Sequence, residues 1–112
     1  MKKVNIRYRL RVSDNSKNKR LIKKAMEDAG YELEVNDMVK VDFVVWDESY
    51  GIDSMMKNTI DDIVCLCGNR VYEYLKKSGV DGMGNIRLIK RPFTNKEMMV
   101  VIRDMLMVMR KI

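Results

Sequence analysis

Hydrophobic positions recur along the chain in two rhythms, one typical of strands and one typical of helices. Over Val4–Val12 every second residue is apolar, and Tyr31–Val35 repeats this alternation. A period of two predicts a β-strand with one buried and one polar face. Val41–Trp46 and Asp62–Cys67 are almost continuously apolar, which is typical of parallel strands buried on both sides. A fifth strand is predicted over Ile86–Lys90.

Helices are predicted between most of these strands. The stretch Lys17–Ala29 has apolar residues at helical spacing, follows a cap sequence rich in Ser and Asn, and stops at Gly30. A second helix begins at Asn69 and ends before Ser78, and the last one covers roughly Asn95–Arg110. Strands that alternate with helices predict a parallel sheet with right-handed crossovers.

Two of the connections are short. Only Asn36–Lys40 lies between the second and third strands, and Glu48–Asp61 leaves room for one short helix around Ser54–Asn58. A parallel crossover normally takes about a dozen residues or more. Either Asn36–Lys40 is a loop or single turn with parallel topology, which we favour, or the second and third strands are antiparallel.

The composition fits one domain that spans residues 1–112. Hydrophobic residues make up 46% of the 112-residue chain, which is enough for one core. No apolar run is long enough to cross a bilayer, and none follows Met1 as in a secretory signal. We therefore expect a cytoplasmic protein with no membrane attachment. Cys65 and Cys67 lie on the same side of a strand and are expected to be reduced core thiols.

The charge and the missing residue types narrow the function. A net charge of +6 permits an acidic partner. Aromatic residues are not interleaved with the basic ones, so nucleic acid is not the expected partner. The chain has no His and no glycine-rich nucleotide loop, which argues against a self-sufficient enzyme.

Five short segments, taken in order, resemble the receiver domains of response regulators. Val12–Asn15 resembles the acidic turn after the first strand, and Met26–Tyr31 resembles the end of the first helix. Asp42–Asp47 is similar to the strand that ends in the phosphoacceptor aspartate. Ser78–Gly82 and Arg91–Thr94 resemble the lead-in to the last strand and the Lys-Pro-Phe signature behind it. The resemblance covers most of the chain.

The resemblance implies a fold and a chemistry. The fold is a three-layer, flavodoxin-like α/β sheet of five parallel strands in the order 2-1-3-4-5, here with shortened second and third helices. Asp47 would be the phosphoacceptor, and Asp14 would join it as a ligand of Mg²⁺. A carboxylate that attacks phosphorus needs a neighbouring divalent cation to neutralise charge on the transferred group.

Several positions depart from the family pattern. Ser13 stands where a second acid is usual, so the affinity for Mg²⁺ should be weak. Cys67 stands at the switch position usually held by Thr or Ser, and a thiol is a weak donor to a phosphoryl oxygen. Arg91 precedes Pro92 where Lys is expected, and a shift of one residue would let Lys90 serve instead.

The first two strands suggest an exposed polar face. Arg7, Arg9 and Arg11 share one side of a strand that is normally buried on both sides. Glu32 and Glu34 lie on the polar side of its expected neighbour, so we predict a ladder of Arg–Glu pairs. This arginine face is a candidate interaction surface.

The last helix is a second candidate surface. Met98–Met109 holds more apolar residues than one buried face requires, and the resemblance implies docking or dimerisation there. The favoured function is therefore a stand-alone, two-component-type signalling domain that contacts a protein partner or a second copy. A histidine kinase would phosphorylate it on Asp47 if it is phosphorylated at all. The alternatives are a structural pseudo-receiver without phosphoryl chemistry and a basic adaptor associated with nucleic acid.

Overall fold

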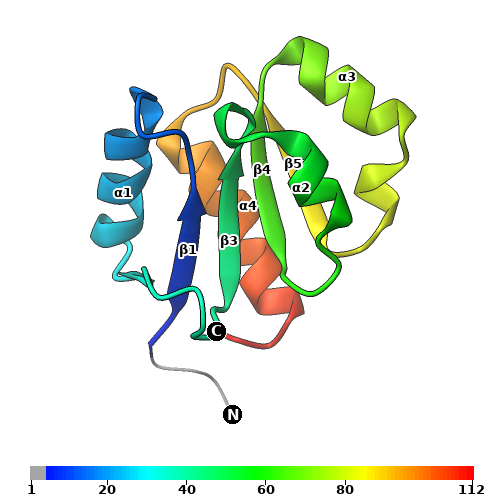
Figure 1. Cartoon of the computed structure of the whole chain (residues 1–112). Helices are drawn as coiled ribbons and strands as arrows, with labels where there is room; N and C mark the ends of the chain where they lie inside the picture. The colour runs from blue at the N-terminus through cyan, green and yellow to red at the C-terminus, as the bar shows by residue number, and fades with distance from the viewer. Residues whose placement is uncertain (1–4) are drawn as a thin grey trace.

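The computed structural model describes residues 5–112, which fold around one sheet of five parallel strands in the order β2-β1-β3-β4-β5 (Figure 1). The strands are β1 (Arg7–Arg11), β2 (Glu32–Leu33), β3 (Phe43–Asp47), β4 (Ile63–Cys67) and β5 (Ile86–Lys90). The helices are α1 (Asn18–Asp28), α2 (Ile52–Lys57), α3 (Asn69–Lys77) and α4 (Asn95–Val108), with short 3-10 turns η1 (Glu48–Tyr50) and η2 (Val80–Gly82).

The parallel direction of the strands confirms the prediction from the alternation of strands and helices, and the strand order confirms the order that the resemblance implies. All five strands lie within the predicted stretches or one residue beyond them. Val4, the first residue of the first predicted strand, lies outside the described residues. Thr94 begins α4 with a capping box, in which its hydroxyl accepts from the Glu97 N–H and the Glu97 carboxylate accepts from the Thr94 N–H.

Helices cover the sheet on both faces, which gives the predicted three layers (Figure 1). On one face α1 and α4 pack against alternate residues of the central strands, including Tyr8, Phe43 and Val45. On the other face α2 and α3 pack against the intervening residues, including Val44 and Trp46. Because β3 and β4 are buried from both sides, their sequences are continuously apolar.

The connection between β2 and β3 crosses β1 without a helix. Residues 34–42 form a loop with a single turn at 37–38, so the favoured prediction of a loop with parallel topology is confirmed. The helix predicted to be short after β2 is absent, whereas the short helix after β3, which is α2, retains six residues. The side of β1 that this loop covers carries arginines, so a crossing helix would have no apolar surface to pack against.

Arg9 takes the place of a hydrophobic contact under this loop. The residue is only 7% exposed, and its guanidinium donates to the carbonyl oxygens of Asn36, at 2.9 Å, and of Val39. Its Nε lies 3.4 Å from the Asp37 carboxylate. The interpretation of Arg9 as part of an interaction surface was therefore wrong, because the loop buries the side chain that a partner would contact.

The predicted ladder forms in part. Arg7 lies 3.6 Å from both Glu32 and Glu34, as predicted. Arg11 instead donates to Asp37 at 2.8 Å, the same carboxylate that faces Arg9. Asp37 lies in the loop, beyond the strand in which the glutamates were placed, so only the folded loop brings it to the arginines.

Asp37 should make the stability of the protein depend on pH. The hydrogen bond and charge of Arg11, with the charge of Arg9, lower the pKa of the Asp37 carboxyl below its usual 3.8. A lowered pKa in the folded state contributes stability above the unfolded pKa, and this contribution is lost as the pH falls through the folded pKa. Asp37→Asn should therefore be less stable than wild type at neutral pH, with the difference vanishing in acid. Urea unfolding from neutral to acidic pH measures this difference in stability. A difference that stays constant with pH would contradict the pairing of Asp37 with the arginines.

Candidate functional site

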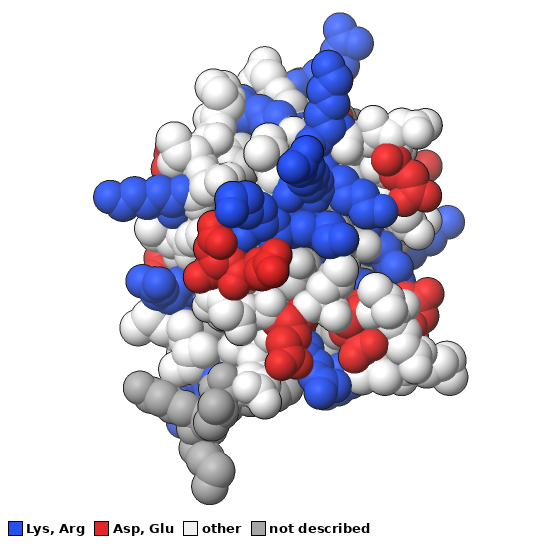
Figure 2. All heavy atoms as spheres, turned by 90° about the vertical axis from the view of Figure 1, so that its left-hand side faces the viewer, with Lys and Arg blue, Asp and Glu red and all other residues white. Residues whose placement is uncertain are grey.

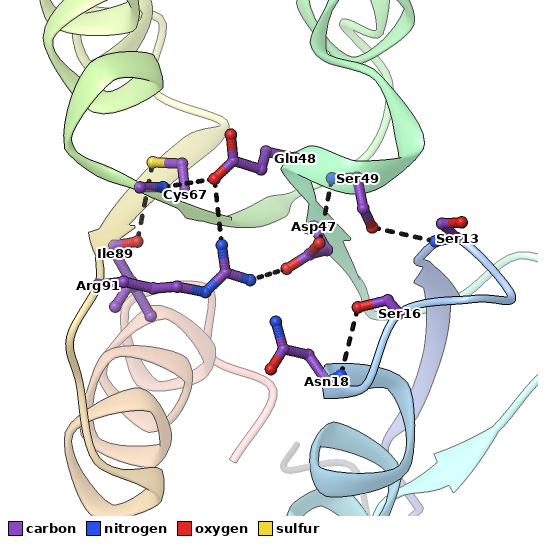
Figure 3. A network of polar contacts seen from close by, with 10 residues as sticks. Ser13, Ser16, Asn18, Asp47, Glu48, Ser49, Cys67, Ile89 and Arg91 are labelled. Atoms are coloured by element: carbon purple, nitrogen blue, oxygen red, sulfur yellow. Dashed lines mark hydrogen bonds and ion pairs between the residues drawn. The ribbon is translucent and has the colours of Figure 1, made fainter.

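The polar residues of interest gather at the carboxyl ends of the strands, as expected for an open α/β sheet (Figure 3). Asp47 is the last residue of β3 and is only 1% exposed. Arg91 directly follows β5, and Gly68 directly follows β4. The loop after β1 supplies Ser13 and its neighbours. Parallel strands bring these segments to one edge although they are far apart in the sequence.

A guanidinium cation is paired with Asp47. One terminal nitrogen of Arg91 donates to Oδ1 of Asp47, while the other carboxylate oxygen accepts from the backbone N–H of Ser49 at 3.0 Å. The side chain of Asp47 is almost fully buried and that of Arg91 is 29% exposed. Both oxygens of the predicted phosphoacceptor therefore already have partners from this chain.

Glu48 completes the network and was not identified from the sequence. Its Oε1 accepts from the second terminal nitrogen of Arg91 at 3.2 Å and from the backbone N–H of Gly68 at 2.7 Å. A Cβ at Gly68 would lie 3.1 Å from this oxygen, so the glycine permits the close approach. The signal in the sequence was the second acid directly after Asp47. The sequence does not show that it turns toward β4 and β5.

The loop after β1 is joined to the site through serines. The backbone N–H of Ser13 donates to the hydroxyl of Ser49 at 3.1 Å, and the N–H of Asn18 donates to Ser16 at 3.2 Å (Figure 3). The first contact joins the loop to η1 beside Asp47, and the second is local to the start of α1. None of them supplies a negative charge.

Asp14 lies in this loop with its side chain in solvent. Its side chain is 90% exposed and forms an ion pair with Lys19 at 2.8 Å. The hydrogen bond and charge of Lys19 lower the pKa of the Asp14 carboxyl. The predicted Asp14–Asp47 pair is therefore not assembled, because a local cation on α1 holds one member and Arg91 holds the other.

These residues do not fit a Mg²⁺ ion. Mg²⁺ requires oxygen ligands with octahedral geometry and keeps several waters. Within residues 5–112, no three His, Cys, Asp or Glu side chains are grouped closely enough to hold a metal ion. At Asp47 the place of a cation is taken by the Arg91 guanidinium, and Ser13 is neutral.

The remaining predicted site residues lie nearby without joining the network. Cys67 is fully buried, and its thiol lies 3.8 Å from the carbonyl oxygen of Ile89. Lys90 points to the face of α3, with its ammonium 5.1 Å from the centre of the Tyr72 ring. The alternative in which Lys90 serves in place of Arg91 was therefore wrong, since the strand register directs the two side chains differently.

Both cysteines are free thiols, as predicted. They lie in the core that α2 and α3 cover, and neither is exposed. A hydrogen bond to Cys67 and burial raise the pKa of the Cys65 thiol. Cys65 therefore stays protonated and acts as a core residue.

A mainly apolar hollow adjoins Arg91. Its volume is about 260 Å³, and it lies between the start of α1 and the connection from β5 to α4. The residues that line it include Leu21 and Ile22 of α1, Pro92 and Phe93 of the connection, and Met98 of α4. Leu21 is 58% exposed at its edge.

Basic residues gather at the start of α1 and along it, where Arg20, Lys23 and Lys24 line a second hollow. Figure 2 shows Lys and Arg gathered on this face of the molecule, with a smaller group of Asp and Glu beside them. Lys17, Arg20, Lys23 and Lys24 are all exposed. Of these four, Lys24 has an ion pair at 3.9 Å, with Asp28.

The fold defines the class as receiver-like, and the predicted phosphoacceptor Asp47 is paired with Arg91. Among solved structures, the chain is similar to the receiver domain of the TMAO respiratory system response regulator TorR. The two are 15% identical, and the match covers 91% of this chain and 97% of the other with a TM-score of 0.68. No protein-family model and no curated protein matches the sequence. The similarity shows the fold, and the fold is that of a response-regulator receiver domain.

Proposed function

We propose that this protein is a receiver-like signalling domain that acts by protein contact and does not depend on phosphorylation of Asp47. The ion pair between Asp47 and Arg91 is the observation that carries the proposal. It occupies the carboxylate that would attack phosphorus. The proposal keeps the protein contact of the favoured hypothesis and takes the absence of phosphoryl chemistry from the pseudo-receiver alternative.

The arrangement of charges disfavours phosphoryl transfer. A carboxylate nucleophile needs an approaching phosphodonor in line with it and a divalent cation beside it. Here the side chain of Asp47 is 2% exposed and paired, and Asp14 is held by Lys19. Arg91 neutralises Asp47, but a guanidinium binds oxygens only through its N–H donors. It therefore cannot coordinate a transferred phosphoryl group as a metal ion does.

The surface beside the site supports contact with a protein. The hollow next to Phe93 is mainly apolar, and exposed Lys17 and Arg20 lie just before α1 and in its first turn. Apolar anchors within a charged rim are typical of protein interfaces. In this proposal a histidine kinase or a second copy of the chain could bind as a contact partner, without transfer of a phosphoryl group. Within residues 5–112 no helix is long and apolar enough to cross a membrane.

Intact-mass spectrometry with acetyl phosphate and Mg²⁺ tests the proposal. The wild-type protein should gain no phosphoryl group, while a phosphorylation-competent receiver domain treated in parallel should gain one. Trp46, the only tryptophan, adjoins Asp47 and packs against Tyr50, so its fluorescence reports on the site. Addition of Mg²⁺ should leave this fluorescence unchanged. A phosphoryl adduct that disappears in Asp47→Asn would overturn the proposal.

A further inference from the structure

Donors from two other segments of the chain bind the carboxylate of Glu48, as a protein binds an anionic ligand. Its Oε1 receives one hydrogen bond from the Arg91 guanidinium, at 3.2 Å, and one from the Gly68 backbone N–H, at 2.7 Å. The two donors belong to segments that follow different strands, and neither is a sequence neighbour of Glu48. The contact is therefore made by the tertiary structure and not by a local turn.

These two donors form an oxyanion site. Gly68 is the N-cap residue of the nine-residue helix α3, whose N-terminus carries a partial positive charge and attracts anions. The first turn of α3 contains no acidic residue, and no side chain of its own caps it. Arg91 supplies a full positive charge in the planar geometry that suits carboxylate and phosphate oxygens.

The site lies directly beside Asp47. Arg91 contacts Oδ1 of Asp47 with one nitrogen and Oε1 of Glu48 with the other (Figure 3). An anionic group attached to Asp47 would therefore meet the same guanidinium that now holds Glu48. The side chain of Glu48 is 31% exposed, so the position it occupies is reached from solvent.

We propose that Glu48 is a built-in anion that fills a site able to bind a tetrahedral oxyanion of the phosphate type. The carboxylate connects the end of β3 with the segments that follow β4 and β5. This inference deepens the proposed function: it rests on that function for its signalling meaning, but the binding of the anion can be tested without it. Removal of the carboxylate opens the site to inorganic phosphate.

The experiment compares phosphate binding to wild type and to Glu48→Ala. The amide resonance of Gly68, one of six glycines, is followed by ¹H–¹⁵N NMR during titration with inorganic phosphate. Glu48→Ala should show a saturable shift of this resonance with an affinity at least about tenfold tighter than wild type. Thermal unfolding should show a matching gain of stability in phosphate over sodium chloride of equal ionic strength.

Two variants serve as controls. Glu73→Ala removes an exposed carboxylate from α3 without opening the site, so its Gly68 resonance should behave as in wild type. Glu48→Gln removes the charge but keeps a side chain of the same size in the site, so it should bind phosphate much more weakly than Glu48→Ala. General salt effects on stability would appear equally in all variants.

The results separate this inference from the proposed function. A Gly68 resonance in Glu48→Ala that moves no more with phosphate than in Glu73→Ala would overturn the oxyanion site. If Glu48→Ala does not fold in chloride, folding in phosphate supports the site, and failure in both buffers overturns it. The proposed function fails instead through a phosphoryl adduct on Asp47 of the wild type, which these titrations do not measure.

Discussion

Arg91→Met is expected to lower the free energy of unfolding by about 3–5 kcal/mol, because it leaves Asp47 as a buried carboxylate without its cation. Methionine preserves much of the length of the side chain, so the loss reports mainly on charge. The Ser49 N–H still donates to Asp47, but a single backbone hydrogen bond does not compensate a buried charge. Chemical denaturation monitored through Trp46 fluorescence measures the effect.

Two further variants distinguish the ion pair from general damage at the end of β5. Lys90→Met changes the adjacent cation, which lies over the Tyr72 ring, and should cost less than about 1 kcal/mol. The double variant Asp47→Asn with Arg91→Met removes both charges and should be more stable than Arg91→Met alone. Equal losses in Arg91→Met and Lys90→Met would contradict the assigned ion pair.

Arg9→Met is expected to lower the free energy of unfolding by about 1.5–3 kcal/mol, the range for hydrogen bonds made by charged groups. The variant loses the donors to the carbonyl oxygens of Asn36 and Val39, which hold the loop 34–42 over β1. The loop lies near solvent, so water can satisfy these carbonyls in part. Its backbone amides should exchange faster with solvent, which hydrogen-exchange mass spectrometry detects.

Arg7→Met is the matched control for this second prediction. Arg7 lies two residues earlier on the same side of β1, but its side chain is 44% exposed and its ion pairs are 3.6 Å long. Exposed pairs of this kind contribute about 1 kcal/mol or less. A loss of stability in Arg7→Met as large as in Arg9→Met would refute the anchoring role of Arg9.

The fold could be predicted from the order of local patterns. Alternation over β1, continuous apolar runs over β3 and β4, and helical spacing over α1 and α4 each reflect a periodicity that one segment carries by itself. Strands that alternate with helices then leave few topologies, since crossovers are right-handed and short. The positions of Asp47 and Arg91 at the ends of their strands followed from the same information.

The contacts of the site depended on tertiary structure. Asp14 and Asp47 were both predicted near one edge of the sheet, yet Lys19 holds the first and Arg91 the second. A sequence shows that a carboxylate is present, but the partner of that carboxylate depends on side-chain directions set by packing. The role of Glu48 was not predicted for the same reason.

The sequence by itself therefore determined five strands that alternate with helices in a parallel α/β sheet, because hydrophobic periodicity and turn residues act over a few neighbouring positions. The receiver-like strand order followed from the resemblance of short segments to receiver domains. Tertiary structure alone decided that a loop anchored by Arg9 replaces a helix, and that Arg91 joins Asp47 to Glu48. Those outcomes depend on charges from distant segments that meet only when β1, β3, β4 and β5 are aligned. Which charges pair depends on the distance between them in space, and only the folded chain sets that distance.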